Sequence, residues 1–186
     1  MKTKRFRWWH GAAFYAGVQL ASYALKAAAR RSTNQPASRE ADREFYREQR
    51  RPWFAPPPAA FPVAWGINSV SAIAGGLHVL NLPAGAEGRA EFLRLQAAAW
   101  VLFAAFDAAY FGLRSPVNAA AITLAYTAVT AASVDVALRR MKDRYAAASL
   151  ATTAAWLALA NPVGLSVAAR NPDPFWKTEP VEPVTA

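Results

Sequence analysis

Cysteine is absent from the sequence, which excludes disulfide bonds and any metal or redox site built on thiolates. Charged residues are also scarce: they make up 18% of the 186 residues, where a quarter is usual. They crowd into the N-terminus, residues 26–52, residues 139–144 and the tail, and the stretches between them are nearly free of charge. Intrinsic disorder is excluded as well, because 54% of the residues are hydrophobic.

The charges that are present give a net charge of +9. Such a basic balance suits nucleic acid, an anionic membrane surface or the flanks of membrane spans. Nucleic-acid binders gather Lys and Arg on one face with exposed aromatic residues, whereas here the basic residues stand at the ends of apolar stretches. We therefore expect a lipid bilayer, and no nucleic acid, as a partner of this chain.

Five apolar stretches approach the length of about 20 residues that a helix needs to cross a bilayer. They cover residues 8–29, 59–82, 95–113, 116–138 and 145–169. The first follows a basic N-terminus like that of a signal peptide, but it contains His10, Gln19 and Lys26 and no clean cleavage site, so we expect it to be retained. An alanine-rich soluble bundle is the alternative. The stretch from Pro116 to Val134 argues against it, because it has no charge and lacks the polar face of a soluble helix.

The predicted fold class is therefore all-α: an integral membrane bundle of five transmembrane helices. Residues 1–170 are expected to form one domain with a lid loop at about residues 30–58, and residues 171–186 an irregular, proline-containing tail. Basic residues are divided almost evenly between the two sides of this topology, so they do not predict its orientation. The composition is compatible with a bacterial inner membrane, which is the predicted location.

Residues 45–65 combine aromatic residues with five prolines. Proline fixes φ and lacks an N–H donor, so residues 52–58 cannot form an ordinary helix and should form a stiff segment before the second span. This segment would bring Trp53, Phe54 and Phe61 to the end of that span. An aromatic belt at the membrane interface, where Trp is common, is the alternative to a binding role.

The same segment resembles the signature of the TspO/translocator-protein family of tryptophan-rich sensory proteins. The matching residues follow one another without a gap: Tyr46, Arg51, Pro52, Trp53, Phe54, Pro56, Pro57, Phe61, Pro62 and Trp65. Phe45 and Phe54 stand where the family commonly has tryptophan. A second block, residues 110–114, reads Tyr-Phe-Gly-Leu-Arg and is similar to the end of the family's third span.

The resemblance implies a central pocket for porphyrins and other flat apolar molecules, with the first loop as its lid. Trp65 and Trp156 match two tryptophans that line the pocket, Ala160 matches a small residue that keeps it open, and Tyr46 matches a tyrosine of the lid. The predicted ligand-binding residues are Tyr46, Trp53, Phe54, Pro56, Pro57, Phe61, Trp65, Phe103, Phe106, Asp107, Trp156 and Ala160. Protoporphyrin IX or haem is the candidate ligand, and no cofactor or metal is expected to be required.

Several positions of this chain depart from the family's pattern. In the third span, two phenylalanines stand where many members have Asn and Trp. In the fifth span, two threonines and a glycine stand where Pro-Tyr and Asn are common. These residues are Phe103, Phe106, Thr152, Thr153 and Gly164. The second half of the pocket therefore differs in sequence from the family's pattern, which allows a changed ligand preference.

Two carboxylates in or near the apolar stretches need a partner or a function, because ionised groups are costly in a bilayer. Asp135 lies four residues before Arg139, which predicts an ion pair on one helix face. Asp107 lies within the third span. It is either a pocket carboxylate, a partner of Lys26 or His10, or a protonated interior residue.

Ala104, Ala108 and Gly112 recur every four residues in the third span, a pattern that lets membrane helices approach closely. Bacterial relatives tend to dimerise through this span, so the resemblance implies a homodimer. Three functions stay open: a receptor or transport-like protein for porphyrins, an enzyme that breaks down protoporphyrin in light, and a scaffold or sensory partner with a drifted pocket. The first is the favoured hypothesis, and no catalytic residue is assigned.

Overall fold

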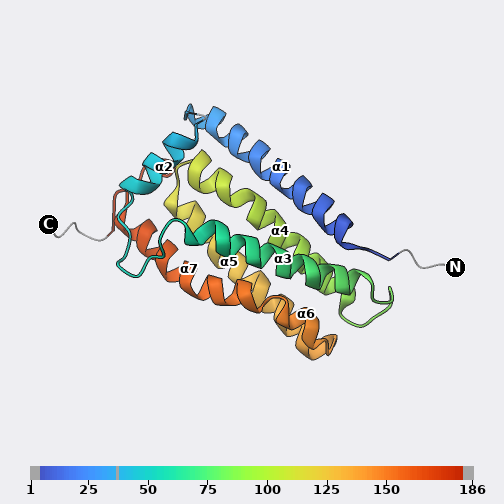
Figure 1. Ribbon diagram of the computed structural model, residues 1–186. Coiled ribbons are helices and arrows are strands. Elements are labelled where there is room, and N and C mark those ends of the chain that lie inside the picture. The colour runs from blue at the N-terminus through green and yellow to red at the C-terminus, as the bar shows by residue number, and fades with distance from the viewer. Residues whose placement is uncertain (1–4, 37, 182–186) are drawn as a thin grey trace. The chain divides into compact units, whose positions relative to one another are not determined.

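The computed structural model describes residues 5–36 and 38–181, and within these ranges the regular structure is helical apart from one isolated bridge between Asp173 and Thr178. The helices in chain order are α1 (Trp8–Thr33), α2 (Arg39–Glu48), α3 (Ala60–Leu80), α4 (Arg89–Asp107), α5 (Pro116–Asp135), α6 (Arg144–Ala148) and α7 (Ala151–Arg170) (Figure 1). The π-helical turns η1 (Ala108–Gly112) and η2 (Val136–Arg140) continue α4 and α5. The five apolar stretches of the sequence therefore all contain helix, and the all-α prediction is confirmed.

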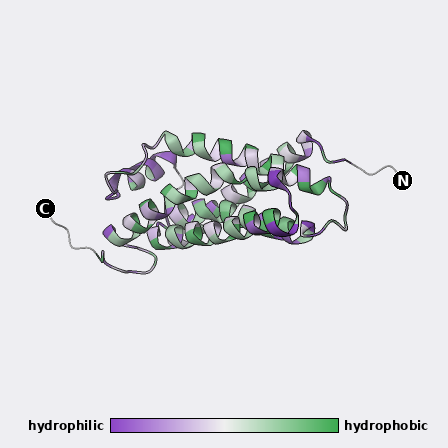
Figure 2. Ribbon diagram, turned by 90° about the horizontal axis from the view of Figure 1, so that it is seen from below, coloured by the Kyte–Doolittle hydropathy of each residue, from purple (hydrophilic) through white to green (hydrophobic). Residues whose placement is uncertain are grey.

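Four helical segments are long and apolar enough to cross a membrane: Ala60–Leu80, Arg89–Gly112, Pro116–Arg140 and Arg144–Arg170. The long helices are mostly green or white on the hydropathy scale of Figure 2, whereas α2 is mostly purple. Helix α1 has the length of a span but not the apolar character, because residues such as Gln19 and Lys26 interrupt it. The predicted count of five transmembrane helices is therefore not confirmed.

A helix, α2, lies within residues 30–58, which we expected to form a loop throughout. Ser38 caps its N-terminus, since its Oγ accepts a hydrogen bond from the amide of Ala41 at 3.0 Å. Glu40 and Asp42 in the first turn complement the helix dipole. No proline lies between Pro36 and Pro52, where α2 forms, and residues 50–59 are non-helical as the prolines predict.

The chain divides into two compact units, which are described separately here. Unit 1 takes Met1–Val18, Pro56–Val101 and Tyr126–Leu157, and unit 2 takes Gln19–Ala55, Leu102–Ala125 and Ala158–Ala186, each as far as its residues are described. Helices α1, α4, α5 and α7 contribute residues to both units. The prediction of a single domain stays a prediction.

Unit 1 has a core of small and aliphatic side chains. Its buried members are Ala72, Val79, Phe92, Val136, Ala137, Ala146, Ala147 and Leu150. The helices approach closely at Gly75, where an added Cβ would lie 1.9 Å from the Oγ of Ser149. Small residues at such a contact are typical of membrane helices, whose association depends on close packing.

Several buried or partly buried polar side chains in the same part of unit 1 are paired. Ser71 donates to the carbonyl of Ser149 at 2.7 Å, and Gln96 donates to the Oγ of Ser133 at 3.0 Å. The imidazole Nε2 of His78 lies 2.6 Å from Oδ2 of Asp143. This contact gives His78 a structural partner near the end of α3.

Asp143 also caps α6, because its Oδ1 accepts a hydrogen bond from the amide of Ala146 at 2.9 Å. Burial opposes ionisation of this carboxyl group. The hydrogen bonds from Ala146 and His78, the charge of His78 and the amide of Tyr145 outweigh that effect and hold the pKa of Asp143 below its ordinary value.

Unit 2 includes the C-terminal segment, which we expected to be irregular. Asp173 is 1% exposed, and its carboxylate accepts hydrogen bonds from the Ser115 hydroxyl (2.6 Å) and from three backbone amides. One of these amides belongs to Val117 in the first turn of α5, so Asp173 stabilises the N-terminus of that helix. The other two belong to residues 175 and 176 and fold the tail into a turn. Residues 182–186 of the predicted tail lie outside the described ranges.

Asn171 ties this segment to the connection between α2 and α3. Its Oδ1 accepts a hydrogen bond from the amide of Arg50 at 2.8 Å, and its Nδ2 donates to the carbonyl of Arg50 at 3.0 Å. A third hydrogen bond runs from Nδ2 to the carbonyl of Val167 in α7. A single side chain therefore satisfies both backbone groups of Arg50.

Candidate functional site

Two aromatic pairs lie in unit 1, and each contains one of the predicted pocket tryptophans. The rings of Phe61 and Trp156 are 5.3 Å apart and nearly perpendicular, at 88°. The rings of Trp65 and Tyr126 are 5.9 Å apart, also at 88°. Edge-to-face geometry of this kind is favourable for aromatic pairs beyond the area that they bury.

Helix α3 supplies one member of each pair, because Phe61 and Trp65 are four residues apart and lie on neighbouring turns of the same face. Their partners come from α7 and α5. The aromatic residue that the sequence did not single out is Tyr126, which is buried. In the sequence, Tyr126 is an aromatic residue in a charge-free stretch, and this alone does not indicate that it contacts Trp65.

Three buried polar atoms in unit 1 have no hydrogen-bond partner among the described residues. They are Nδ2 of Asn68, Oγ of Ser69 and Oγ1 of Thr153. Asn68 and Ser69 follow Trp65 by one turn of α3, and Thr153 precedes Trp156 by one turn of α7. Sequence reasoning noted Thr153 only as a departure from a family pattern and did not notice the other two.

Unit 2 has an aromatic cluster of its own. Its buried members are Phe45, Tyr110 and Ala119, with Tyr46, Phe106 and Phe111 packed against them. The rings of Phe45 and Tyr110 lie 5.3 Å apart, and those of Phe106 and Tyr110 lie 5.9 Å apart. The cluster therefore joins α2 to the end of α4 and to η1.

Cationic side chains lie over this aromatic cluster. The guanidinium carbon of Arg51 is 4.7 Å from the ring centre of Tyr46, and that of Arg114 is 5.4 Å from the ring centre of Phe45. Such cation–π contacts are favourable when a guanidinium stands over an aromatic face. The predicted lid tyrosine, Tyr46, is therefore held on one side by an arginine of the proline-containing segment.

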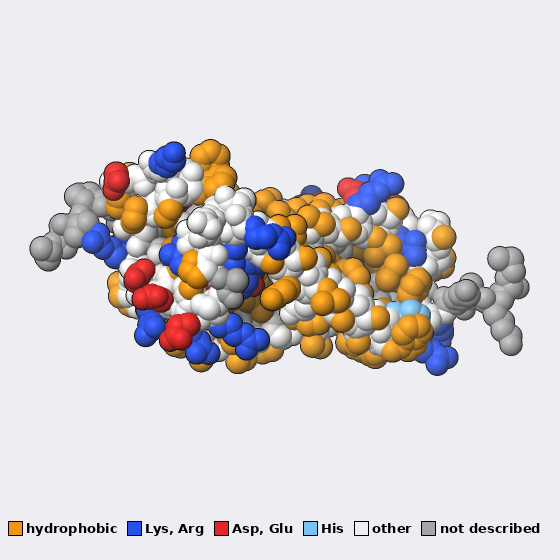
Figure 3. Space-filling model, turned by 90° about the horizontal axis from the view of Figure 1, so that it is seen from above, with side chains coloured by type: hydrophobic (Ala, Val, Ile, Leu, Met, Phe, Trp, Pro, Cys, Tyr) orange, Lys and Arg blue, Asp and Glu red, His pale blue; other side chains and the backbone are white. Residues whose placement is uncertain are grey.

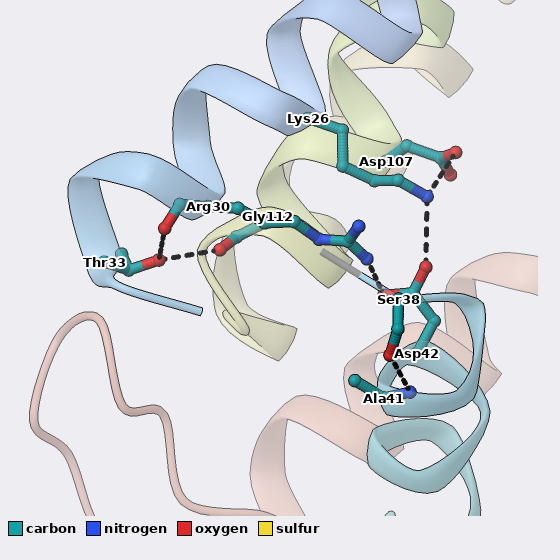
Figure 4. Close-up of polar contacts among 8 residues, drawn as sticks. All are labelled: Lys26, Arg30, Thr33, Ser38, Ala41, Asp42, Asp107 and Gly112. Atoms are coloured by element: carbon teal, nitrogen blue, oxygen red, sulfur yellow. Dashed lines mark hydrogen bonds and ion pairs between the residues drawn. The ribbon is translucent and has the colours of Figure 1, made fainter. Parts of the chain in front are cut away.

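A charged cluster in unit 2 joins α1, α2 and α4 (Figure 4). Lys26 lies between two carboxylates, with its Nζ 3.1 Å from Asp42 and 3.5 Å from Asp107. The guanidinium of Arg30 also pairs with Asp42, and its Nε is buried without a hydrogen-bond partner among the described residues. Of the roles left open for Asp107, pairing with Lys26 is the one found.

The profile of the TspO/MBR family matches residues 15–169, which is most of the chain. The chain belongs to the TspO/MBR family. A comparison with curated proteins gave no match. Membership in the TspO/MBR family together with four membrane-length apolar helices supports a multi-pass membrane protein. On the face drawn in Figure 3, hydrophobic side chains are abundant, and charged side chains gather in separate groups.

The ligand-binding residues suggested by TspO/MBR resemblance fall into both units. Unit 1 holds Pro56, Pro57, Phe61, Trp65 and Trp156, and unit 2 holds Tyr46, Trp53, Phe54, Phe103, Phe106, Asp107 and Ala160. In unit 1 the three aromatic members, together with Tyr126, form the two pairs described above. In unit 2, Tyr46 and Phe106 share the aromatic cluster, whereas Trp53 is 95% exposed and its ring centre lies 5.7 Å from that of Phe54.

The structure of this TspO/MBR protein also shows the surroundings of other residues that the sequence singled out. The ion pair between Asp135 and Arg139 is confirmed at 2.6 Å. His10 stacks on the ring of Trp9 at 3.5 Å and accepts a hydrogen bond from the amide of Arg7. Gly112 lies against α1, since an added Cβ would be 2.6 Å from the Cβ of Ala29. Of the three small residues predicted to form a helix-contact face, Ala104, Ala108 and Gly112, the last therefore packs against α1 of the same chain.

A cavity of about 380 Å³ also lies in unit 1. Its lining residues are Thr127, Thr130, Ala131, Val134, Asp135, Leu138, Arg139, Ala154 and Leu157. The residues predicted to bind ligand do not include any of these, so the cavity and the aromatic pairs are different features of unit 1. Among the described residues, His, Asp and Glu side chains do not gather into a group of three that could hold a metal ion.

Proposed function

We propose that this TspO/MBR protein is a membrane receptor or transport-like protein that binds porphyrins or similar flat hydrophobic ligands. The observation that supports this function is the pair of indole-containing aromatic contacts in unit 1, formed by Trp65 and Trp156. Both tryptophans are partly buried and lie on helical segments apolar enough to cross a membrane.

The chemistry of these side chains suits a planar apolar ligand. Indole and phenyl rings offer large contact areas and lose little conformational freedom on binding. Sites for small hydrophobic molecules are mostly apolar, with a few polar groups that fix orientation. Two tryptophans in neighbouring aromatic pairs can therefore stack on a macrocycle once one ring of each pair turns aside.

Titration of the detergent-purified protein with protoporphyrin IX, followed by quenching of tryptophan fluorescence, tests this function. We expect saturable quenching in the wild type and at least tenfold weaker binding in the double variant Trp65→Phe/Trp156→Phe, because both stacking partners shrink. Trp100→Phe is the matched control, since Trp100 pairs with Phe14 elsewhere in unit 1 at 5.3 Å. Quenching that never saturates, or that is equal in both variants, would contradict the proposal.

Illumination of the same samples distinguishes binding from porphyrin breakdown. Loss of porphyrin absorbance in the wild type, but not in the double variant, would favour the enzyme hypothesis. A protein that neither binds nor degrades porphyrin would instead fit a scaffold or sensory partner. A homodimer and a location in a bacterial inner membrane are further parts of the proposal, and the mass of the protein in nanodiscs tests the dimer.

A further inference from the structure

The buried polar side chains of unit 1 fall into two groups, those with a hydrogen-bond partner and those with an atom that has none among the described residues. Some are paired, as in the hydrogen bonds from Gln96 to Ser133 and from the Ser149 hydroxyl to the carbonyl of Ala146. Asn68, Ser69 and Thr153 are 4%, 4% and 2% exposed, yet each has a side-chain atom without a hydrogen-bond partner among the described residues. The unpaired atoms are those within one helical turn of Trp65 and Trp156.

Helix α3 packs against the segment that leads into α7, and this packing places Asn68 and Thr153 at similar heights along the two helix axes. Phe61 meets Trp156 at one end, and Ser71 meets Ser149 at the other. Asn68 and Thr153 both lie between these two contacts along their helices. With a rise of about 1.5 Å per residue, they come within roughly one turn of the same height. Ser69 follows Trp65 by four residues and therefore lies on its face of α3.

Leaving such groups unpaired is costly. A buried donor without a partner loses its hydrogen bonds to water and regains none in the folded protein. Within a membrane-spanning segment, bulk water cannot supply the missing bond. Apolar residues of similar shape would fill the same positions without this cost, so three unpaired groups beside the two aromatic pairs call for a partner from outside the chain.

We infer that Asn68, Ser69 and Thr153 form a polar subsite that hydrogen-bonds an uncharged oxygen acceptor, such as a carbonyl or ester, on a flat hydrophobic ligand. This inference rests on the proposed function and specifies its ligand. The amide of Asn68 and the two hydroxyls are neutral donors. Helix α3 from Ala60 to Leu77 and α7 from Ala151 to Ala169 carry no charged residue that would neutralise a carboxylate.

Two porphyrins that differ in oxygen content test this subsite. Etioporphyrin carries only alkyl groups, whereas the dimethyl ester of protoporphyrin IX carries ester carbonyls and no charge. We expect the wild-type protein to bind the ester about fivefold more tightly, which corresponds to one net hydrogen bond. The isosteric variants Asn68→Leu and Thr153→Val, and the variant Ser69→Ala, should each reduce this preference, and the triple variant should abolish it.

Ser71→Ala is the matched control, because Ser71 is a serine of the same helix whose hydroxyl is already paired. It should leave the preference for the ester unchanged. Thermal unfolding of the ligand-free proteins adds a second measurement. Asn68→Leu and Thr153→Val should raise the unfolding temperature, because they remove unpaired buried groups, whereas Ser71→Ala should lower it.

The outcomes separate this inference from the function on which it rests. If both porphyrins bind the wild type equally, or if the triple variant keeps the preference, the subsite is refuted while porphyrin binding stands. Lower unfolding temperatures for Asn68→Leu and Thr153→Val would also refute it, since the groups would then be paired in the free protein. If neither porphyrin binds the wild type, the proposed function and the subsite both fail.

Discussion

The two units of this protein are stabilised by different chemistry, although the same long helices supply residues to both. In unit 1, small residues such as Gly75 allow close packing, and the buried side chains of Gln96 and Ser133 share a neutral hydrogen bond. The pairs that involve charge in this unit include the more exposed side chains of His78 and Arg139. In unit 2, acidic side chains such as Asp42 and Asp173 connect segments that are far apart in the sequence. The comparison shows that a few charged side chains can matter for stability even in a chain of low charge content. Those in the interior of unit 2 each contact specific partners.

The largest effect is expected from Asp42→Asn in unit 2. This change removes the anion shared by Lys26 and Arg30, and Arg30 is then left buried without its counterion. Loss of one partner of a buried ion pair costs about 3 kcal/mol. The free energy of unfolding in mild detergent, measured by denaturant titration, should fall by that amount.

Lys26→Met is the matched control for this prediction, because it leaves Arg30 paired with Asp42. It should cost less than Asp42→Asn, since Asp107 then loses a partner but is more exposed than Asp42. Equal losses for the two variants would mean that the cluster acts through Lys26 alone. The contrast with unit 1 would then be weaker than described above.

A smaller effect is expected from Gly75→Ala, which tests the close packing of unit 1. The added Cβ would lie 2.7 Å from the Cβ of Ser149, so the helices must separate or tilt. Overpacking of this size costs about 2 kcal/mol, measured as a fall in the free energy of unfolding. Ser149→Gly combined with Gly75→Ala should recover part of the loss. Gly76→Ala is the control, since nothing lies within 4 Å of its added Cβ.

The smallest effect concerns the pH dependence of the pair between His78 and Asp143 in unit 1. The folded-state pKa of Asp143 is below its ordinary value of about 3.9, so its contribution to stability is present above that pH and is lost as the pH falls through the folded pKa. Asp143→Asn should cost about 1 kcal/mol at pH 6. The gap in unfolding temperature between wild type and variant should close toward pH 3. A gap of constant size would contradict this prediction.

The positions of the long helices were predictable because apolar length and proline placement are local properties. Pro116 begins α5, and the prolines from Pro52 to Pro58 keep that segment non-helical. The pair between Asp135 and Arg139 was predictable for the same reason, since the two residues are four apart on one helix. Helix α2 was missed although Ser38 and the acidic first turn are a recognisable start signal.

Contacts between distant segments were not predictable in the same way. The sequence left Asp107 with several candidate partners, and only the packing of α1 against α4 in unit 2 selects Lys26. The partner of Trp65 likewise depends on which face of α5 meets α3 in unit 1. The aromatic residues of the site were thus identified one by one, while their pairing required the fold.

The hydrogen bonds between Asn171 and Arg50 have a consequence for the synthesis of the protein. The two residues are 121 positions apart, and the chain is made from its N-terminus. The backbone groups of Arg50 therefore leave the ribosome long before their partner exists, and they acquire it only after α7 has been translated. The connection between α2 and α3 thus gains these hydrogen bonds only after the last long helix has been made, and a chain cut before residue 171 would lack them.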